Sequence, residues 1–155
     1  MILWVDFEPR SACDLTVAGV YNYAQDASTD VLCMSYAFDD EEVVTWTPGQ
    51  PFPERVKNHK GLIYAHNAAF ERLIFWFVLL ADFKLEQFYC TAAQARSNCA
   101  PGSLEDVGRF AGASMKKDHR GSQLIRLLSV PQANGCLLYT SDAADDSLRV
   151  DLGGR

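Results

Sequence analysis

The sequence predicts an α/β fold, a mixed β-sheet flanked by helices. Short apolar runs bounded by turn residues dominate the first half and are typical of buried strands. Helical patterns appear between and after these runs, which favours strands and helices in one sheet domain. The chain has 155 residues, of which 48% are hydrophobic and 12% aromatic. That composition is sufficient for the core of a single domain.

Alternating or continuous apolar residues predict five strands. Asp39-Asp40 is a plausible turn that would join the second and third strands in a hairpin. Residues 9–30 carry little periodicity, so we expect a long loop there with one helical turn at most. The expected strands are Ile2–Glu8, Val31–Phe38, Glu42–Thr47, Leu62–Ala65 and Leu85–Tyr89.

Helices are expected where apolar spacing changes and capping residues occur. Asn67 is a candidate N-cap for a helix over Ala68–Ala81, which is apolar around most of its circumference and should be buried on both sides. We therefore assign the side chains of Phe70–Leu80 to the core rather than to a base-stacking surface. Further helices are expected over Glu54–His59, Thr91–Asn98, Ser103–Phe110 (with a capping-box-like start) and Gly121–Ser129.

Charge and cysteine content limit the function classes. The net charge of −6 argues against an autonomous, strongly basic nucleic-acid binder. The one basic cluster is either a solvated loop or a contact for backbone phosphates, and it contains Lys116, Lys117, His119 and Arg120. Five cysteines without C-x-x-C or zinc-like spacing indicate buried free thiols in a reducing cytosol.

No membrane or secretory segment is expected. The apolar run Leu73–Ala81 has nine residues, whereas a transmembrane helix needs about 20. The N-terminus has no basic region followed by an apolar one, as a secretory signal would have. The sequence is therefore typical of a soluble protein of the cytoplasm.

Three acidic residues are the candidate reactive groups. Asp6 and Glu8 lie two positions apart on the first strand and should project from one face. Glu71 follows another apolar strand. Carboxylates gathered in this way favour a hard divalent cation with oxygen ligands. The alternatives are a strand end that enters solvent and, for Glu71, an acid stabilised by the first turn of a helix.

These segments resemble the 3′–5′ proofreading exonuclease domain of bacteriophage-type family A DNA polymerases, in the DnaQ-like (DEDD) superfamily. Asp6-Phe7-Glu8 resembles the D-x-E of the first exonuclease motif, and Asn67-Ala68-Ala69-Phe70-Glu71 resembles the second motif. Flanking similarities extend to about residue 131, and they include Arg10–Leu15, Cys90–Ala93, Pro101–Glu105, Lys117–Gly121 and Leu124-Ile125.

The resemblance implies a ribonuclease H-like mixed sheet and a two-metal hydrolysis of 3′-terminal phosphodiesters. Asp6, Glu8 and Glu71 would be the catalytic and metal-binding residues, with two divalent cations, Mg²⁺ or Mn²⁺. Phe7, Asn67 and Phe70 would contact the substrate. The partners would be a single-stranded 3′ end of DNA and a polymerase region of the same parent chain, in the cytoplasm of a phage-infected or prophage-carrying bacterium.

Three departures from the family pattern affect this expectation. Glu71 stands where the superfamily usually has Asp. Pro9 stands where Thr is more frequent, so a hydroxyl and a backbone N–H are both missing. The third motif, Tyr-x-x-x-Asp or His-x-x-x-x-Asp, does not occur: Leu124 is the fifth residue after His119, and Ala143 is the fourth after Tyr139.

The C-terminal segment from Cys136 to Arg155 resembles the conceptual translation of a sequencing adapter. We therefore expect residues 1–135 to be a partial exonuclease domain, truncated before its last helix and nearly inactive alone, and residues 136–155 to be a non-native tail. Two other readings remain open. One is a stand-alone DnaQ-like RNA or DNA exonuclease truncated in the same way, and the other is a non-catalytic nucleic-acid-binding module.

Overall fold

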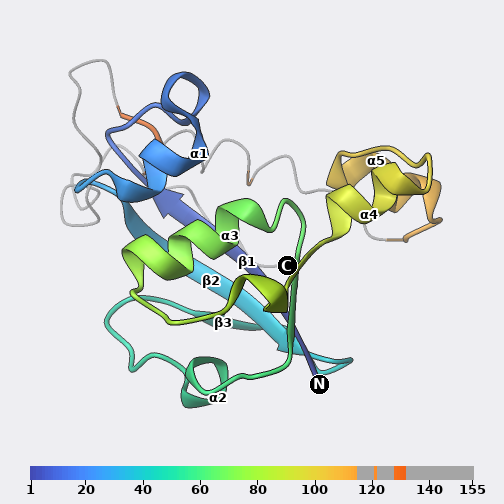
Figure 1. Cartoon of the computed structure of the whole chain (residues 1–155), viewed down its shortest axis with the longest axis horizontal. Helices are drawn as coiled ribbons and strands as arrows, with labels where there is room; N and C mark the ends of the chain where they lie inside the picture. Colours follow the sequence, from blue (N-terminus) through green and yellow to red (C-terminus); the bar gives the residue numbers. More distant parts are fainter. Residues whose placement is uncertain (115–120, 122–127, 132–155) are drawn as a thin grey trace, which may run out of the picture.

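A mixed five-stranded sheet forms the centre of the molecule. The computed structural model describes residues 1–114, 121 and 128–131. The strand order is β3-β2-β1-β4-β5, with β1 antiparallel to β2 and parallel to β4 (Figure 1). This arrangement confirms the predicted α/β, ribonuclease H-like class. The strands are β1 (Ile2–Arg10), β2 (Asp30–Phe38), β3 (Val44–Trp46), β4 (Leu62–Ala65) and β5 (Phe88–Cys90).

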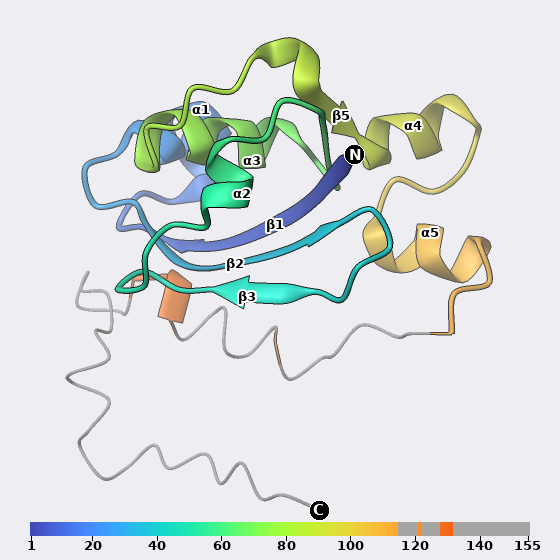
Figure 2. The same ribbon diagram turned by 90° about the horizontal axis from the view of Figure 1, so that it is seen from below.

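The helices of the first ninety residues cover one face of this sheet. Figure 2 shows α1, α2 and α3 on the same side of β1 and β2, while α4 and α5 lie beyond one end of the sheet. The helical elements are α1 (Leu15–Gln25), α2 (Glu54–Lys57), α3 (Ala69–Leu73), the π-helical η1 (Ile74–Val78), the 3₁₀ turn η2 (Leu85–Gln87), α4 (Thr91–Ser97) and α5 (Leu104–Phe110).

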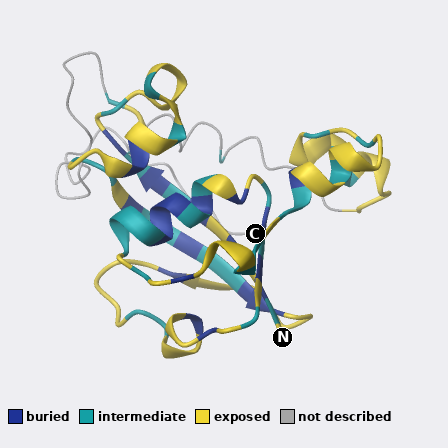
Figure 3. Ribbon diagram, in the orientation of Figure 1, coloured by how far each residue is buried: buried dark blue, intermediate teal, exposed yellow. Residues whose placement is uncertain are grey.

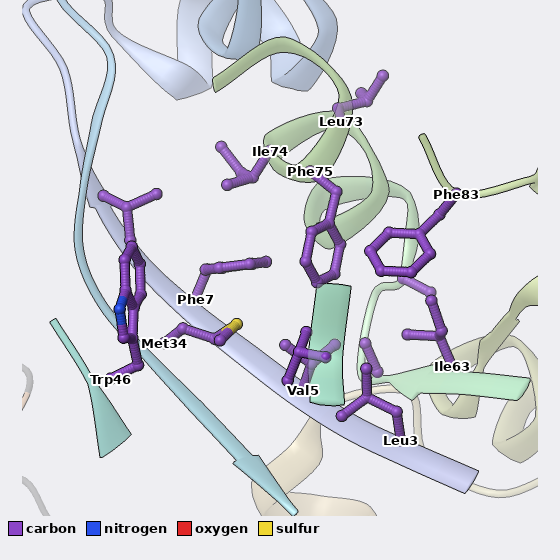
Figure 4. Close-up of a cluster of buried hydrophobic side chains, with 14 of the residues drawn as sticks. Leu3, Val5, Phe7, Met34, Trp46, Ile63, Leu73, Ile74, Phe75 and Phe83 are labelled. Carbon is purple, nitrogen blue, oxygen red and sulfur yellow. The ribbon is translucent and has the colours of Figure 1, made fainter. Parts of the chain in front are cut away.

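The core lies between the sheet and this helical layer. Leu3, Val5 and Phe7 alternate along β1 and are buried, because their side chains face the helices. Phe75 points from η1 into the space between Phe7 and Phe83, with ring centroids 4.8 Å from each (Figure 4). Burial is concentrated in the central strands and α3, whereas α4 and α5 are mostly exposed (Figure 3). The assignment of the Phe70–Leu80 side chains to the core is confirmed for Leu73, Ile74 and Phe75, whereas Leu80 is 81% exposed.

The expectation of a loop over residues 9–30 is wrong, because β1 continues to Arg10 and α1 follows. Asp14 caps α1 by accepting hydrogen bonds from the N–H groups of Thr16 and Val17, at 2.8 Å and 3.4 Å. Gly19 interrupts the helix with a φ of 77°. This kink splits the apolar spacing into two short pieces, which explains why the sequence shows no helical period there.

The helix predicted over Ala68–Ala81 is two elements, α3 and η1, and Asn67 is not its N-cap. Asn67 adopts a left-handed φ of 78°, and the capping position is taken by Ala68 without a side-chain hydrogen bond. Asn tolerates this conformation better than most residues, which accounts for an Asn at the turn. The chain therefore turns sharply between β4 and α3.

Other boundaries differ by a few residues. The fifth strand begins at Phe88 because residues 85–87 form η2, and the helix expected over Glu54–His59 ends at Lys57. The strand expected over Glu42–Thr47 is limited to Val44–Trp46. The start of α5 is as predicted, since Ser103 accepts the N–H of Asp106 at 3.1 Å. Most of Gly121–Ser129, the basic cluster at residues 116–120 and the segment 136–155 lie outside the described residues.

The cysteines in the described ranges are free, as predicted, but they are not fully buried. Cys13, Cys33 and Cys90 are half-buried, and Cys99 is exposed. Cys99 lies in a left-handed turn directly after α4, which leaves its side chain at the surface. Within the described part of the chain, no helix combines the length and apolar character needed to cross a bilayer.

Candidate active site

Asp6 and Glu8 occupy the face of the sheet opposite the helices. Asp6 is exposed and Glu8 is half-buried. Val5, which precedes Asp6, and Phe7, which separates the two acids, are buried on the other face. Across the antiparallel pair, Asp6 is opposite Ser35 and Glu8 is opposite Cys33. This placement on one face agrees with the alternation of the sequence.

An irregularity in the β1–β2 pairing follows directly after Glu8. Glu8 pairs with Cys33, but Pro9 pairs with Val31, so the register shifts and Leu32 is the extra residue on β2. Proline has no N–H to donate, and within a sheet it is tolerated at such bulges. Pro9 therefore fits the strand geometry at the end of the acidic pair.

Glu71 is an acidic side chain inside the protein. It lies on α3, is 3% exposed, and its Oε2 atom has no hydrogen-bond partner among the described residues. Burial raises the pKa of Glu71 to about 8, its own backbone N–H opposes the shift, and the charges of Asp6 and Cys90 add to it. Glu71 and Asp6 therefore lie close enough to interact electrostatically.

The pKa of Asp6 is shifted in the same direction as that of Glu71. Desolvation raises the pKa of Asp6, and the neighbouring His66 acts in the opposite direction. Asp6 and His66 line one groove of about 320 Å³ on the open face of the sheet. The groove also contains aromatic and aliphatic side chains, among them Trp4, Tyr36, Tyr64 and Leu104.

The buried oxygen of Glu71 is suited to a cation. An unsatisfied carboxylate oxygen in the protein interior is costly, and a hard metal ion would remove that cost. However, within the described ranges no three His, Cys, Asp or Glu side chains are grouped closely enough to hold one ion together. Glu71 thus lies near enough to Asp6 to interact with its charge. Asp6, Glu8 and Glu71 do not, however, form one ligand set in the structure.

The residues predicted to contact substrate lie in different surroundings. Phe7 is buried against Phe75 on the helical side of the sheet. Phe70 is half-buried, with its ring 6.0 Å from that of Tyr23. Asn67 is exposed at the turn before α3. Phe7 therefore belongs to the core beneath the candidate site, and Asn67 is the most accessible of the three.

Sequence reasoning missed Cys90 as a neighbour of the candidate site. Desolvation alone would raise the pKa of the Cys90 thiol, but hydrogen bonds from the backbone N–H groups of Ala93, Ala68 and Asn67 together lower it. The Sγ atom is 3.4 Å from the N–H of Ala93 and occupies the capping position of α4. The signs in the sequence were the position of Cys90 directly before a helix and its place in the Cys90–Ala93 similarity.

Comparison with known proteins gives one informative similarity. No protein-family profile matches the chain. The chain is 35% identical over 147 residues to the DNA polymerase of Bacillus phage SP02, and the match covers 86% of this chain. The chain spans only 22% of the length of that polymerase. The similarity supports a polymerase-related region.

Proposed function

We propose that this region is a 3′–5′ proofreading exonuclease domain of a phage-type DNA polymerase, acting on single-stranded 3′ ends of DNA in the cytoplasm of the host. The observation that carries the proposal is the buried Glu71 carboxyl, with an oxygen that no described group satisfies, beside the strand that bears Asp6 and Glu8. The similarity to a phage polymerase and the ribonuclease H-like sheet support the same reading.

The surroundings of the acidic residues support the roles that we propose for them. Asp6 is exposed in the groove and is accessible to a substrate phosphate with its cations. Glu8 lies about 7 Å further along the same face. Glu71 approaches from the helical side and holds a proton near neutral pH, which must leave before this carboxyl can act as a ligand.

Asp6, Glu8 and Glu71 would hold the two divalent cations, Mg²⁺ or Mn²⁺. Ions held there would supply an activated water molecule and charge stabilisation for the phosphodiester oxygens. The apolar core lies beneath Asp6 and excludes water from the helical side of the sheet. We propose no role for Phe7 beyond packing, whereas Asn67 is available to bind the substrate strand.

Mn²⁺ binding to the purified chain tests the proposal. We expect Asp6→Ala to weaken Mn²⁺ binding at least about tenfold, because the substitution removes a charged oxygen ligand. Glu71→Gln should also weaken it, and Glu42→Gln serves as a control because Glu42 is exposed in the β2–β3 turn. Isothermal titration calorimetry at pH 7.5 measures the affinities. Equal affinity in wild type and Asp6→Ala would contradict the proposal.

An assay of the parent polymerase tests the activity itself. Recovering the reading frame beyond residue 135 should reveal polymerase motifs, whereas a stop codon would indicate a stand-alone exonuclease. The parent protein should release nucleoside monophosphates from a single-stranded oligonucleotide with Mg²⁺, and Asp6→Ala should abolish the release. Binding of the oligonucleotide without any release in wild type would instead indicate a non-catalytic binding module.

A further inference from the structure

His66 connects three segments beside the candidate site. It directly follows β4, and its imidazole is half-buried in the groove that also contains Asp6. Its Nε2 atom lies 2.9 Å from the carbonyl oxygen of Gly102, and Nδ1 lies 3.0 Å from Oγ1 of Thr91. The Nε2–H group must donate to Gly102, because a carbonyl only accepts.

The hydroxyl of Thr91 extends this connection back to the sheet. Its Oγ1 atom also lies 3.3 Å from the carbonyl oxygen of Ala65, so its single O–H proton can be donated either to that oxygen or to Nδ1 of His66. Thr91 opens α4, and Gly102 lies two residues before α5. One imidazole thus joins the end of β4 to the starts of both helices.

These contacts hold a part of the molecule that packs little against the core. In Figures 1 and 2, α4 and α5 project beyond the end of the sheet. The backbone of Gly102 also lies close to the Arg96 side chain, since a Cβ added at Gly102 would collide with the guanidinium group. Gly102 is therefore near both His66 and Arg96, although it is only half-buried.

The same imidazole lies near Asp6, and its chain neighbour Asn67 opens the turn that leads to Glu71. It is near enough to Asp6 to interact with its charge. On its other side, His66 precedes the left-handed residue Asn67, whose carbonyl accepts the N–H of Phe70 at 2.8 Å as the chain enters α3. A displacement of His66 would move this turn and with it Glu71.

We propose that His66 is a positioning residue: it fixes α4 and α5 against the groove and sets the placement of Glu71 relative to Asp6. This inference rests on the proposed function for its catalytic meaning, but the tether itself is independent of metal binding. His66 acts through Glu71 and Asp6 and is not proposed as a ligand.

The tether is tested in metal-free protein by amide hydrogen exchange. We expect His66→Ala to accelerate exchange about tenfold at the hydrogen-bonded amides of α5, such as those of Asp106, Val107 and Ala111. His66→Gln should restore part of the protection, because its amide can still donate to Gly102. The matched control is His59→Gln: His59 is buried, and its Nε2 also contacts a backbone carbonyl, that of Leu62, at 3.0 Å. Unchanged exchange in His66→Ala would overturn the proposal.

The positioning role is tested by Mn²⁺ affinity in the same variants. We expect a roughly tenfold loss in His66→Ala, partial recovery in His66→Gln, and no loss in His59→Gln. An equal loss in the His59 and His66 variants would indicate a general structural effect and would overturn the proposal. If Asp6→Ala does not affect Mn²⁺ binding, the proposed function fails and the positioning role with it, while the exchange result still decides the tether.

Discussion

Glu71 combines two properties that oppose each other in a folded protein, a titratable carboxyl and almost complete burial. In water the charged form of a carboxylate is strongly hydrated, and the interior does not replace that hydration at Oε2. The folded protein consequently retains the proton on Glu71 up to a pH of about 8. A residue of this kind lowers stability near neutral pH unless a cation compensates it.

The metal-free protein should therefore lose stability as the pH rises from about 4.5 to about 8. In that interval the unfolded chain releases the Glu71 proton while the folded chain keeps it, so the free energy of unfolding falls by at most about 1.4 kcal/mol per pH unit. Urea unfolding at several pH values with EDTA measures this slope. Glu71→Gln should remove most of the slope and Glu42→Gln should not. A flat profile in wild type would show that Glu71 is ionised in the folded state.

The sequence alone marked Glu71 as a candidate site residue, but it did not predict that the Glu71 carboxyl is buried. Four apolar residues before His66 and an acid shortly after it are local features, visible without a structure. The burial of the carboxyl depends on α3 lying against α1 and β1, which are more than forty residues away in the chain. The spacing of Asp6 and Glu8, by contrast, follows from strand geometry alone, and the structure agrees with it.

At the scale of elements, the helix after β4 shows how tertiary packing changes a local prediction. The apolar segment was expected to be one α-helix, but its second half, η1, is wound as a π-helix. In η1 the Phe75 side chain is fully buried, and its ring contacts those of Phe7, Phe83 and Phe88. A wider helical turn at this point places one large aromatic side chain at the centre of the core.

Phe75→Ala should lower the free energy of unfolding by about 3–5 kcal/mol, because it removes a buried ring and leaves a cavity. Phe75→Leu should cost less, since much of the volume remains. Phe77, also on η1, is only half-buried against Tyr21 and provides the matched control. Chemical unfolding gives all three values. A loss for Phe75→Ala no greater than that for Phe77→Ala would mean that η1 does not anchor the core as described.

For the whole molecule, the sequence predicted the class of fold and most strands, and it failed where signals are weak or distant. The four strands up to Ala65 were found because buried alternation is a strong local pattern. Helix α1 was missed because Gly19 divides it. The order of the strands, and with it the placement of β4 beside β1, depends on pairing across long stretches of chain that local patterns do not encode.

The central position of β1 has a consequence for how the protein folds. The antiparallel half, β1 to β3, is complete at residue 46, whereas the parallel half needs the chain through Cys90. Parallel pairing closes longer loops and is correspondingly slow. We expect pulse-labelled hydrogen exchange during refolding to protect Met34 before Ile63, and the reverse order would contradict this. Asp6 would then be in place on its strand before Glu71 arrives, so the acidic residues of the candidate site would come together only in the last stage of folding.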